Sequence, residues 1–201
     1  MRRVILSCLV GLSLAGSAQA QPQAHNVVLF IADGLRDGMV NAATAPTMDR
    51  LMRAGVRFTN THSLFPTFTM PNATAMATGH MLGDTGQFGN TIYTAFPVPG
   101  AGESLTPFLE SDPVLGDVDA HFAGNYLNEE TILRAAHAQG LSTASIGKLG
   151  PSLVFDHTAR SGQDSILVDD STGRPGGIPL SEELRTRLGA AGLPTQAPTR
   201  G

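Results

Sequence analysis

The apolar positions along the chain follow two patterns, one typical of buried strands and one typical of amphipathic helices. Residues 25–34 form an almost continuous apolar run that ends in Asp-Gly, as expected of a strand buried on both faces of a parallel sheet. Residues 47–54 follow Pro46 and place their apolar side chains on one face, which predicts a helix. Residues 56–59 predict a short strand. This order of strand, helix and strand favours an α/β fold.

A similar alternation returns in the second half of the chain. Asn128 is expected to cap a helix that ends at Gly140, because Asn is a favoured N-cap and Gly a favoured C-cap. Residues 141–146 and 165–168 are short apolar runs that predict strands. Residues 181–188 have the composition of a helix. The second half is therefore also expected to mix helices and strands.

The stretch from 65 to 90 is rich in Pro, Gly and Thr, yet its middle contains small residues that can form a helix. Pro71 is tolerated in a first helical turn, so we expect a helix over 72–78 with Thr69 just before it. A hydroxyl at that place faces free amides and the positive end of the helix dipole, which suits an anion. The alternative is that Thr69 only caps the helix.

The first twenty residues have the organisation of a signal peptide. Arg2 and Arg3 form a charged start, residues 4–15 are mostly apolar, and a small-x-small sequence ends at Ala20. The apolar run is too short to span a bilayer. We expect cleavage after Ala20, export to the periplasm or the extracellular space, and a single mature domain over 21–201.

Composition and charge narrow the classes of partner. Removing Arg2 and Arg3 from the 13 basic residues leaves 11 against 17 acidic ones, a net charge of −6. Without a basic run, nucleic-acid binding through surface charge is disfavoured. Cys8, the only cysteine, lies in the expected signal peptide, which excludes disulfides and thiolate metal sites from the mature chain. An acidic protein that binds phosphate esters needs a cation to offset their charge.

Two residues at strand ends are candidates for binding. Asp33 follows the first expected strand, at the edge where open α/β sheets place their ligands, although Asp-Gly also suits a simple turn. Lys148 is the only lysine beside twelve arginines, and it follows the expected strand over 141–146. It is suited to hold one phosphate oxygen as a compact point charge. A solvated loop lysine is the alternative.

Several motifs, in this order, resemble those of the alkaline phosphatase superfamily, and most closely its type I phosphodiesterase/nucleotide pyrophosphatase branch. The Ala-Asp-Gly at the end of the first strand is followed by Pro-Thr-Phe-Thr-Met-Pro-Asn at 66–72 and Ala-Thr-Gly at 77–79. Gly-Gln-Phe-Gly-Asn at 86–90 matches the Gly-x-x-Gly-Asn ending of that branch. The similarity covers residues 25–92 well and 125–151 more loosely.

The resemblance implies a fold, an activity and a set of site residues. The implied fold is an alkaline-phosphatase-like sandwich, with a mostly parallel central sheet flanked by helices, incomplete in this chain. The implied activity is metal-dependent hydrolysis of small phosphate esters or nucleotides. Thr69 would be the nucleophile that forms a phosphothreonine, and Asp33 would bind one of two zinc ions, which also holds the threonine oxygen. Asn72 would hydrogen-bond a phosphate oxygen.

Other members of the superfamily match less well. Sulfatases share the nucleophile-x-Pro pattern, but they need Cys or Ser as the nucleophile and an Arg two residues after the Pro, where this chain has Thr69 and Ala73. Some phosphate monoesterases carry Lys-x-Arg at a place resembling Lys148, where this chain has Gly150 in place of the Arg. Both chemistries are therefore disfavoured relative to diester hydrolysis.

The remaining metal ligands of the family have no clear counterpart. Asp117 and His121 have a suitable i, i+4 spacing, and Asp156 precedes His157 directly, but their order and context do not match. No acidic residue or histidine follows Glu183. We therefore expect the chain to be the amino-terminal part of such an enzyme, truncated before these ligands. The alternatives are a non-catalytic secreted anion-binding domain and an inactive fragment of the same fold.

Overall fold

The computed structural model describes residues 26–198. By its internal contacts the chain divides into two units, with the boundary between Arg50 and Leu51. The expected signal peptide, residues 1–20 with cleavage after Ala20, lies outside the described residues. Among the residues that are described, no helix combines the length and the apolar character needed to cross a membrane.

Two of the expected strands are not formed. Residues 26–32 have no regular secondary structure, and their apolar side chains are exposed, up to 88% for Val27. Residues 56–59 are also irregular. A strand needs a partner for its backbone N–H and C=O groups. Within residues 26–198 the only paired strands are β1 (Ala144–Ile146) and β2 (Ile166–Val168), so the predictions over 25–34 and 56–59 were wrong.

The first unit is built from turns, a short helix and the start of α1. Ala32 accepts a hydrogen bond from the amide of Leu35 at 3.2 Å, and Gly34 in this turn has φ +75°, a conformation that glycine adopts without strain. A 3-10 helix, η1 (Asp37–Met39), follows. The predicted helix after Pro46 is confirmed as α1 (Pro46–Ala54), which begins in the first unit and ends in the second.

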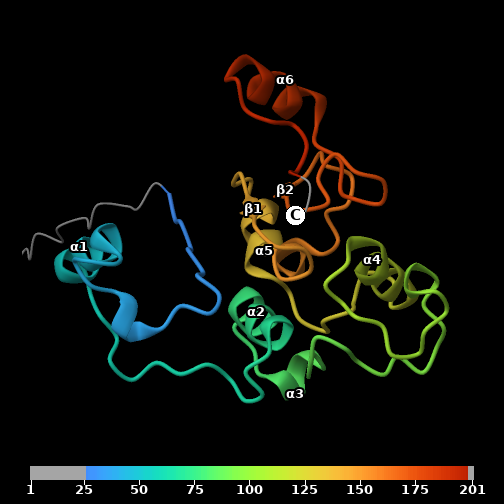
Figure 1. The fold of residues 1–201 in the computed structure, drawn as a ribbon. Coiled ribbons are helices and arrows are strands. Elements are labelled where there is room, and N and C mark those ends of the chain that lie inside the picture. Colours follow the sequence, from blue (N-terminus) through green and yellow to red (C-terminus); the bar gives the residue numbers. More distant parts are fainter. Residues whose placement is uncertain (1–25, 199–201) are drawn as a thin grey trace, which may run out of the picture. The chain divides into compact units, whose positions relative to one another are not determined.

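Helices provide most of the regular structure of the second unit, and short irregular segments join them (Figure 1). Most are short, between three and ten residues. After α1 they are α2 (Thr69–Thr78), α3 (Leu82–Thr85), η2 (Pro99–Ala101), α4 (Asp112–His121), α5 (Ile132–Ala138), η3 (Leu153–Asp156) and α6 (Glu182–Ala190).

The strands predicted over 141–146 and 165–168 are confirmed in position but are shorter than predicted. Strands β1 and β2 pair in parallel, with Ala144 opposite Ile166 and Ile146 opposite Val168. Helix and strand therefore mix around a small parallel sheet, which is compatible with an incomplete α/β fold. The larger sandwich stays a prediction.

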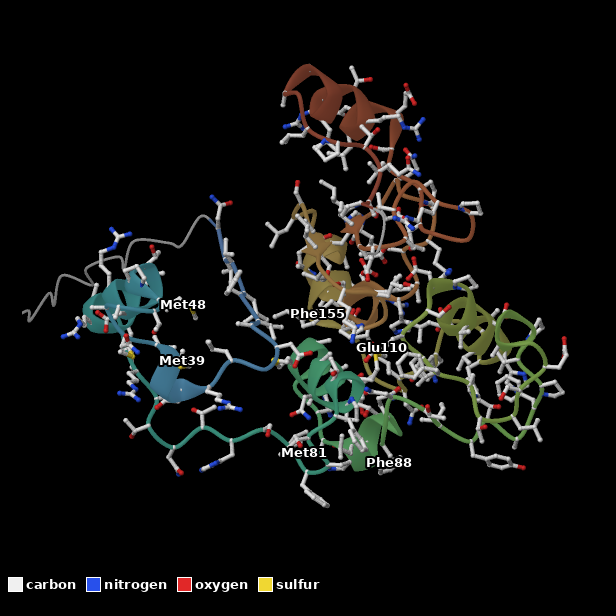
Figure 2. The ribbon with its side chains drawn as sticks, viewed as in Figure 1. Met39, Met48, Met81, Phe88, Glu110 and Phe155 are labelled. Carbon is white, nitrogen blue, oxygen red and sulfur yellow. The ribbon has the colours of Figure 1, made fainter. Side chains whose placement is uncertain are left out.

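The core of the second unit forms where α2 packs against η3 and α5 (Figure 1). Helix α2 contributes Met70 and Ala77, which have no exposed surface. Leu153 and Val154 of η3 lie in the same cluster, as does Phe155, labelled in Figure 2. Burial of each large apolar side chain stabilises the fold by about 1.5–3 kcal/mol. The small residues of α2 let neighbouring backbone approach closely, which places the start of this helix against the rest of the unit.

Two helix starts differ from the prediction. Thr69 is the first residue of α2 rather than its cap, because the preceding Phe68 has the extended backbone (φ −84°, ψ 154°) of an N-cap. Phe68 offers no side-chain cap. Helix α5 begins at Ile132, and Asn128 has φ +60°, so Asn128 belongs to the turn before that helix.

Candidate functional site

The first turn of α2 presents Thr69 with an unpaired hydroxyl. Thr69 is half-buried, and its hydroxyl makes no hydrogen bond within residues 26–198. The turn contains no acidic residue, so no carboxylate on it offsets the positive end of the helix dipole. A hydroxyl and the helix end together are suited to an anion such as a phosphate group.

Asn90 reaches the same turn from a loop twenty residues further along the chain. Its Oδ1 accepts the amide of Met70 at 2.9 Å, which satisfies one of the free amides of α2. Its carbonyl oxygen accepts the amide of Leu109 at 2.8 Å. The Nδ2 amide of Asn90 has no partner in the described part of the chain. The sequence analysis names Asn90 only as the last residue of the Gly-x-x-Gly-Asn motif and assigns it no role. That motif is the sequence feature from which a role of Asn90 could have been predicted.

Asn72 holds the segment in front of α2. Its Oδ1 accepts the amide of Leu64 at 2.8 Å, and its Nδ2 donates to the carbonyl of Phe68 at 2.9 Å. A weaker contact of Nδ2 reaches the carbonyl of Pro66 at 3.4 Å. These bonds fix the backbone that delivers Thr69. Substrate binding by Asn72 stays a prediction, and in this structure its amide is already engaged.

Lys148 is paired with an acidic side chain. Its Nζ forms an ion pair with Oε2 of Glu110, which Figure 2 labels. The side chain of Glu110 is 4% exposed and that of Lys148 is 51% exposed. Oε1 of Glu110 is buried and has no hydrogen-bond partner among the residues that the structure describes. The charge of Lys148 therefore offsets a buried carboxylate, while its exposed side remains accessible to an anion.

The loop that carries Lys148 lies against the start of α2. A Cβ built on Gly150 would lie 2.6 Å from Cα of Glu110 and 3.1 Å from Sδ of Met70. Gly150 also has φ +64°, so both space and backbone conformation require glycine here. The second unit thus brings together the segments that carry Thr69, Asn72 and Lys148, three of the four predicted site residues.

Asp33, the fourth predicted residue, lies exposed in the turn of the first unit. The i, i+4 pair on α4 does not form a joint site. Asp117 accepts the amide of Gly100 at 2.6 Å, and the ring of His121 stacks on Phe96 with centroids 3.5 Å apart. Among the residues that the structure describes, no three acidic, His or Cys side chains are grouped so that they could hold a metal ion.

Asp156 and His157 are buried in separate contacts. Nδ1 of His157 lies 2.9 Å from Oδ1 of Asp119 on α4, with both side chains at most 7% exposed. Asp156 accepts the hydroxyl of Ser165, which in turn lies 2.6 Å from the hydroxyl of Thr143. Both side chains therefore have hydrogen-bond partners inside the fold. Their apparent metal-ligand spacing is therefore explained by packing.

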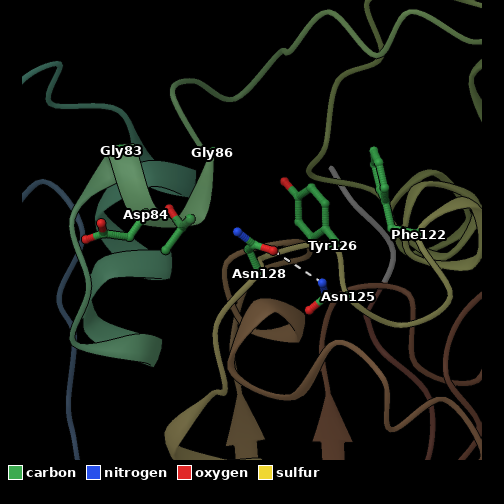
Figure 3. A pocket seen from close by; sticks show the side chains of 8 residues that line it. Gly83, Asp84, Gly86, Phe122, Asn125, Tyr126 and Asn128 are labelled. Atoms are coloured by element: carbon green, nitrogen blue, oxygen red, sulfur yellow. Dashed lines mark hydrogen bonds between the residues drawn. The ribbon is translucent and has the colours of Figure 1, made fainter.

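A separate hollow of about 340 Å³ lies beside α3 (Figure 3). Nδ2 of Asn125 donates to Oδ1 of Asn128 across one side of it, at 3.3 Å. The hydroxyl of Tyr126 is buried and has no hydrogen-bond partner in the described part of the chain, and burial raises the pKa of Tyr126. None of the four predicted site residues lines this hollow; its lining is Gly83, Asp84, Thr85, Gly86, Phe122, Asn125, Tyr126 and Asn128.

Comparison with known proteins identifies the class of protein. The model of the type I phosphodiesterase / nucleotide pyrophosphatase family matches residues 27–190. The chain therefore belongs to this family, which is part of the alkaline phosphatase superfamily. Its members are in general metal-dependent hydrolases of phosphate esters and nucleotides. No curated protein and no solved structure matches the chain significantly.

Proposed function

We propose that this protein hydrolyses phosphodiester or pyrophosphate bonds in small phosphate esters or nucleotides, with Thr69 as the nucleophile. The observation that carries the proposal is the unpaired hydroxyl of Thr69 at the first residue of α2, in a chain that belongs to this family. The expected signal peptide supports action in the periplasm or outside the cell.

The reaction would proceed in two displacements. Oγ1 of Thr69 gives up its proton to solvent and forms a bond to phosphorus as the bond from phosphorus to the first leaving oxygen breaks, and that oxygen takes up a proton from solvent. Water then gives up a proton and forms a bond to the threonine-bound phosphorus, the bond to Thr69 breaks, and Oγ1 takes up a proton again. The positive end of α2 and the Nδ2 amide of Asn90 would stabilise the phosphate oxygens. Lys148 is proposed to contribute its charge from the exposed side, and Asn72 to position Thr69 in addition to its predicted contact with phosphate.

We also propose that two divalent ions, zinc by the family resemblance, are required, with Asp33 and Thr69 among their ligands. A bound divalent ion lowers the pKa of an oxygen nucleophile and offsets the charge of the phosphate. The described residues do not by themselves make such a site. The metal part of the proposal therefore rests on the family and on these two residues, and we assign no reaction step to an ion.

The test is turnover of bis-(p-nitrophenyl) phosphate by the purified protein, with and without added zinc, for wild type and two variants. Thr69→Ala should abolish turnover while the far-UV circular dichroism stays unchanged. Thr67→Ala is the matched control, because it removes the same hydroxyl from an exposed residue of the same segment, and its turnover should equal that of wild type. Turnover by Thr69→Ala equal to that of an active wild type would refute the role of Thr69 as the nucleophile.

A second candidate function is a secreted domain that binds anions without catalysis. One observation favours it: the first turn of α2 carries no acidic residue, and the hydroxyl of Thr69 makes no hydrogen bond within residues 26–198, an arrangement suited to an anion without a metal. Calorimetric titration with inorganic phosphate distinguishes the two. Binding that is independent of metal, in a protein without turnover, would support this candidate. An inactive fragment would show neither binding nor turnover.

A further inference from the structure

A single hydroxyl joins two buried carboxyl groups at the start of α4. Oγ of Ser171 lies 2.6 Å from Oδ2 of Asp112 and 2.8 Å from Oδ1 of Asp169. The amide of Ser171 also donates to Oδ1 of Asp169, at 2.8 Å. Asp112 has no exposed surface and Asp169 is 8% exposed. These contacts join the first residue of α4 to the turn that follows β2.

Two ionised carboxylates in contact with the hydroxyl of Ser171 would need two donated hydrogens, and this hydroxyl has only one. A hydroxyl has one hydrogen to donate, and an ionised carboxylate can only accept. If both acids were ionised, one of the two short contacts would place lone pairs against lone pairs. We propose that in mildly acidic solution Asp112 keeps its proton and donates this hydrogen to Ser171, which donates its own to Asp169. This chain of hydrogen bonds, the shared-proton chain, holds the turn after β2 against α4.

The surroundings assign the proton to Asp112 rather than to Asp169. Oδ1 of Asp169 already accepts the amide of Ser171 and therefore acts as an acceptor in this turn. The pKa of Asp112 is raised from 3.8 to about 6, chiefly by burial and also by the charge of Asp169 and the contact with it, whereas the contacts with Ser171 and with the amide of Ile178 lower it. Within residues 26–198, Oδ1 of Asp112 has no hydrogen-bond partner, which costs less for a neutral carboxyl oxygen than for a charged one.

No cation in the described part of the chain pairs with the carboxyl group of Asp112. Arg160 donates to the backbone carbonyl of Asp112 at 2.6 Å instead. Lys148 is paired with Glu110, and Arg174 donates to carbonyls near the end of the described chain. The other acids of α4 and of the turn face separate partners; they are Asp117 on Gly100, Asp119 on His157, and Asp170 on Leu149.

The turn after β2 also makes hydrogen bonds that support the loop that carries Lys148. Oδ1 of Asp170 accepts the amide of Leu149 at 2.9 Å, and the carbonyl of Val168 accepts the amide of Gly147 at 2.9 Å. Loss of the proton leaves two facing carboxylates and breaks the chain through Ser171. The stability of the turn, and with it the support of this loop, should therefore depend on pH.

The direction in which stability changes with pH follows from the difference in pKa between the folded and the unfolded protein. A carboxyl group with a raised pKa in the folded protein contributes its full stability below the unfolded value of 3.8 and loses it as pH rises through about 6. A shift of this size corresponds to a change of up to about a hundredfold in the unfolding equilibrium constant across that pH range.

The first test is urea unfolding of the 201-residue chain at a series of pH values from 4 to 8. Asp112→Asn is neutral at every pH, and its amide can still donate to Ser171, so its stability should lack the loss expected between pH 4 and 7. Asp164→Asn makes the same chemical change at an exposed residue that pairs with Ser161, and it should retain the dependence of wild type. Identical pH profiles for Asp112→Asn and wild type would overturn the proposal.

The second test does not depend on the stability of a variant. Carboxyl carbon chemical shifts of wild-type protein labelled at Asp are followed from pH 3 to 8, and the resonance missing in Asp112→Asn is assigned to Asp112. If this variant does not fold, Ser171→Ala identifies the signal by its altered midpoint. A midpoint near pH 6 is expected. A midpoint near 4, where exposed aspartates titrate, would show that Asp112 is already ionised at pH 5, where the proposal keeps it protonated, and would contradict the shared proton.

Discussion

Two polar clusters in the second unit differ in burial: Thr69 and Asn90 are partly exposed, whereas Asp112, Asp119 and His157 are buried. At the start of α2, the hydroxyl of Thr69 and the Nδ2 of Asn90 have no partner within residues 26–198. Around α4, the pair of Asp119 with His157 and the chain from Asp112 to Ser171 lie inside the fold in short contacts. Both clusters contain residues able to do chemistry. The difference indicates that the cluster around α4 holds the fold, whereas the first turn of α2 keeps polar groups available for a ligand.

The pair of Asp119 with His157 should give the largest effect on stability. His157→Ala leaves a carboxylate buried without its partner, and we expect a loss of about 3–5 kcal/mol in the free energy of unfolding. Urea unfolding at pH 7 measures it. His137→Ala removes an exposed histidine from α5 and should change stability by less than about 0.5 kcal/mol. Similar values for both variants would show that the buried pair contributes no more than a surface residue.

Asn72 lies in the first turn of α2 but makes hydrogen bonds that hold the fold, directly beside the proposed nucleophile. Asn72→Ala removes the contacts with Leu64 and Phe68, and we expect a loss of about 1–3 kcal/mol. Turnover per folded molecule should also fall, because the backbone before Thr69 is no longer held. Asn125→Ala removes an exposed side chain with a single long hydrogen bond and serves as the control. Full stability of Asn72→Ala would assign Asn72 to substrate binding alone.

The ion pair of Lys148 should give the smallest effect on stability. Lys148→Met leaves Glu110 without its cation, but Lys148 is half-exposed, so we expect a loss of about 1 kcal/mol. Glu110→Gln in the same chain should remove most of that loss, since the buried charge is then absent. A phosphate role is measured separately as a rise in KM for bis-(p-nitrophenyl) phosphate in the double variant. An unchanged KM would leave Lys148 with the ion pair as its only role.

Local signals in the sequence were sufficient for several elements. Proline at the start and small or apolar residues afterwards located α1 and α2, and short apolar runs located β1 and β2. The helix predicted over 181–188 is present as α6, which begins one residue later, and the side chain of Ser181 caps it by accepting the amide of Leu184 at 3.1 Å. These features depend on residues close together in the chain, which is why sequence patterns could predict them.

Features that depend on distant partners could not be predicted. The apolar run over 26–32 has the composition of a buried strand, but a strand forms only where another strand pairs with it. The contact of Asn90 with Met70, and the pairing of Lys148 with Glu110, join segments far apart in the sequence. No periodicity or local spacing contains that information. The family motifs located the turn around Thr69, whereas the contacts that surround it became visible only in the structure.

The nucleophilic role of Thr69 is tested most directly by mass spectrometry of the protein quenched in acid during turnover of bis-(p-nitrophenyl) phosphate. Digestion and sequencing of the adduct should place a p-nitrophenyl phosphoryl group on Thr69, and this adduct should be absent from Thr69→Ala and present in Thr67→Ala. Turnover with the adduct on a different residue, or turnover that persists in Thr69→Ala, would contradict the account.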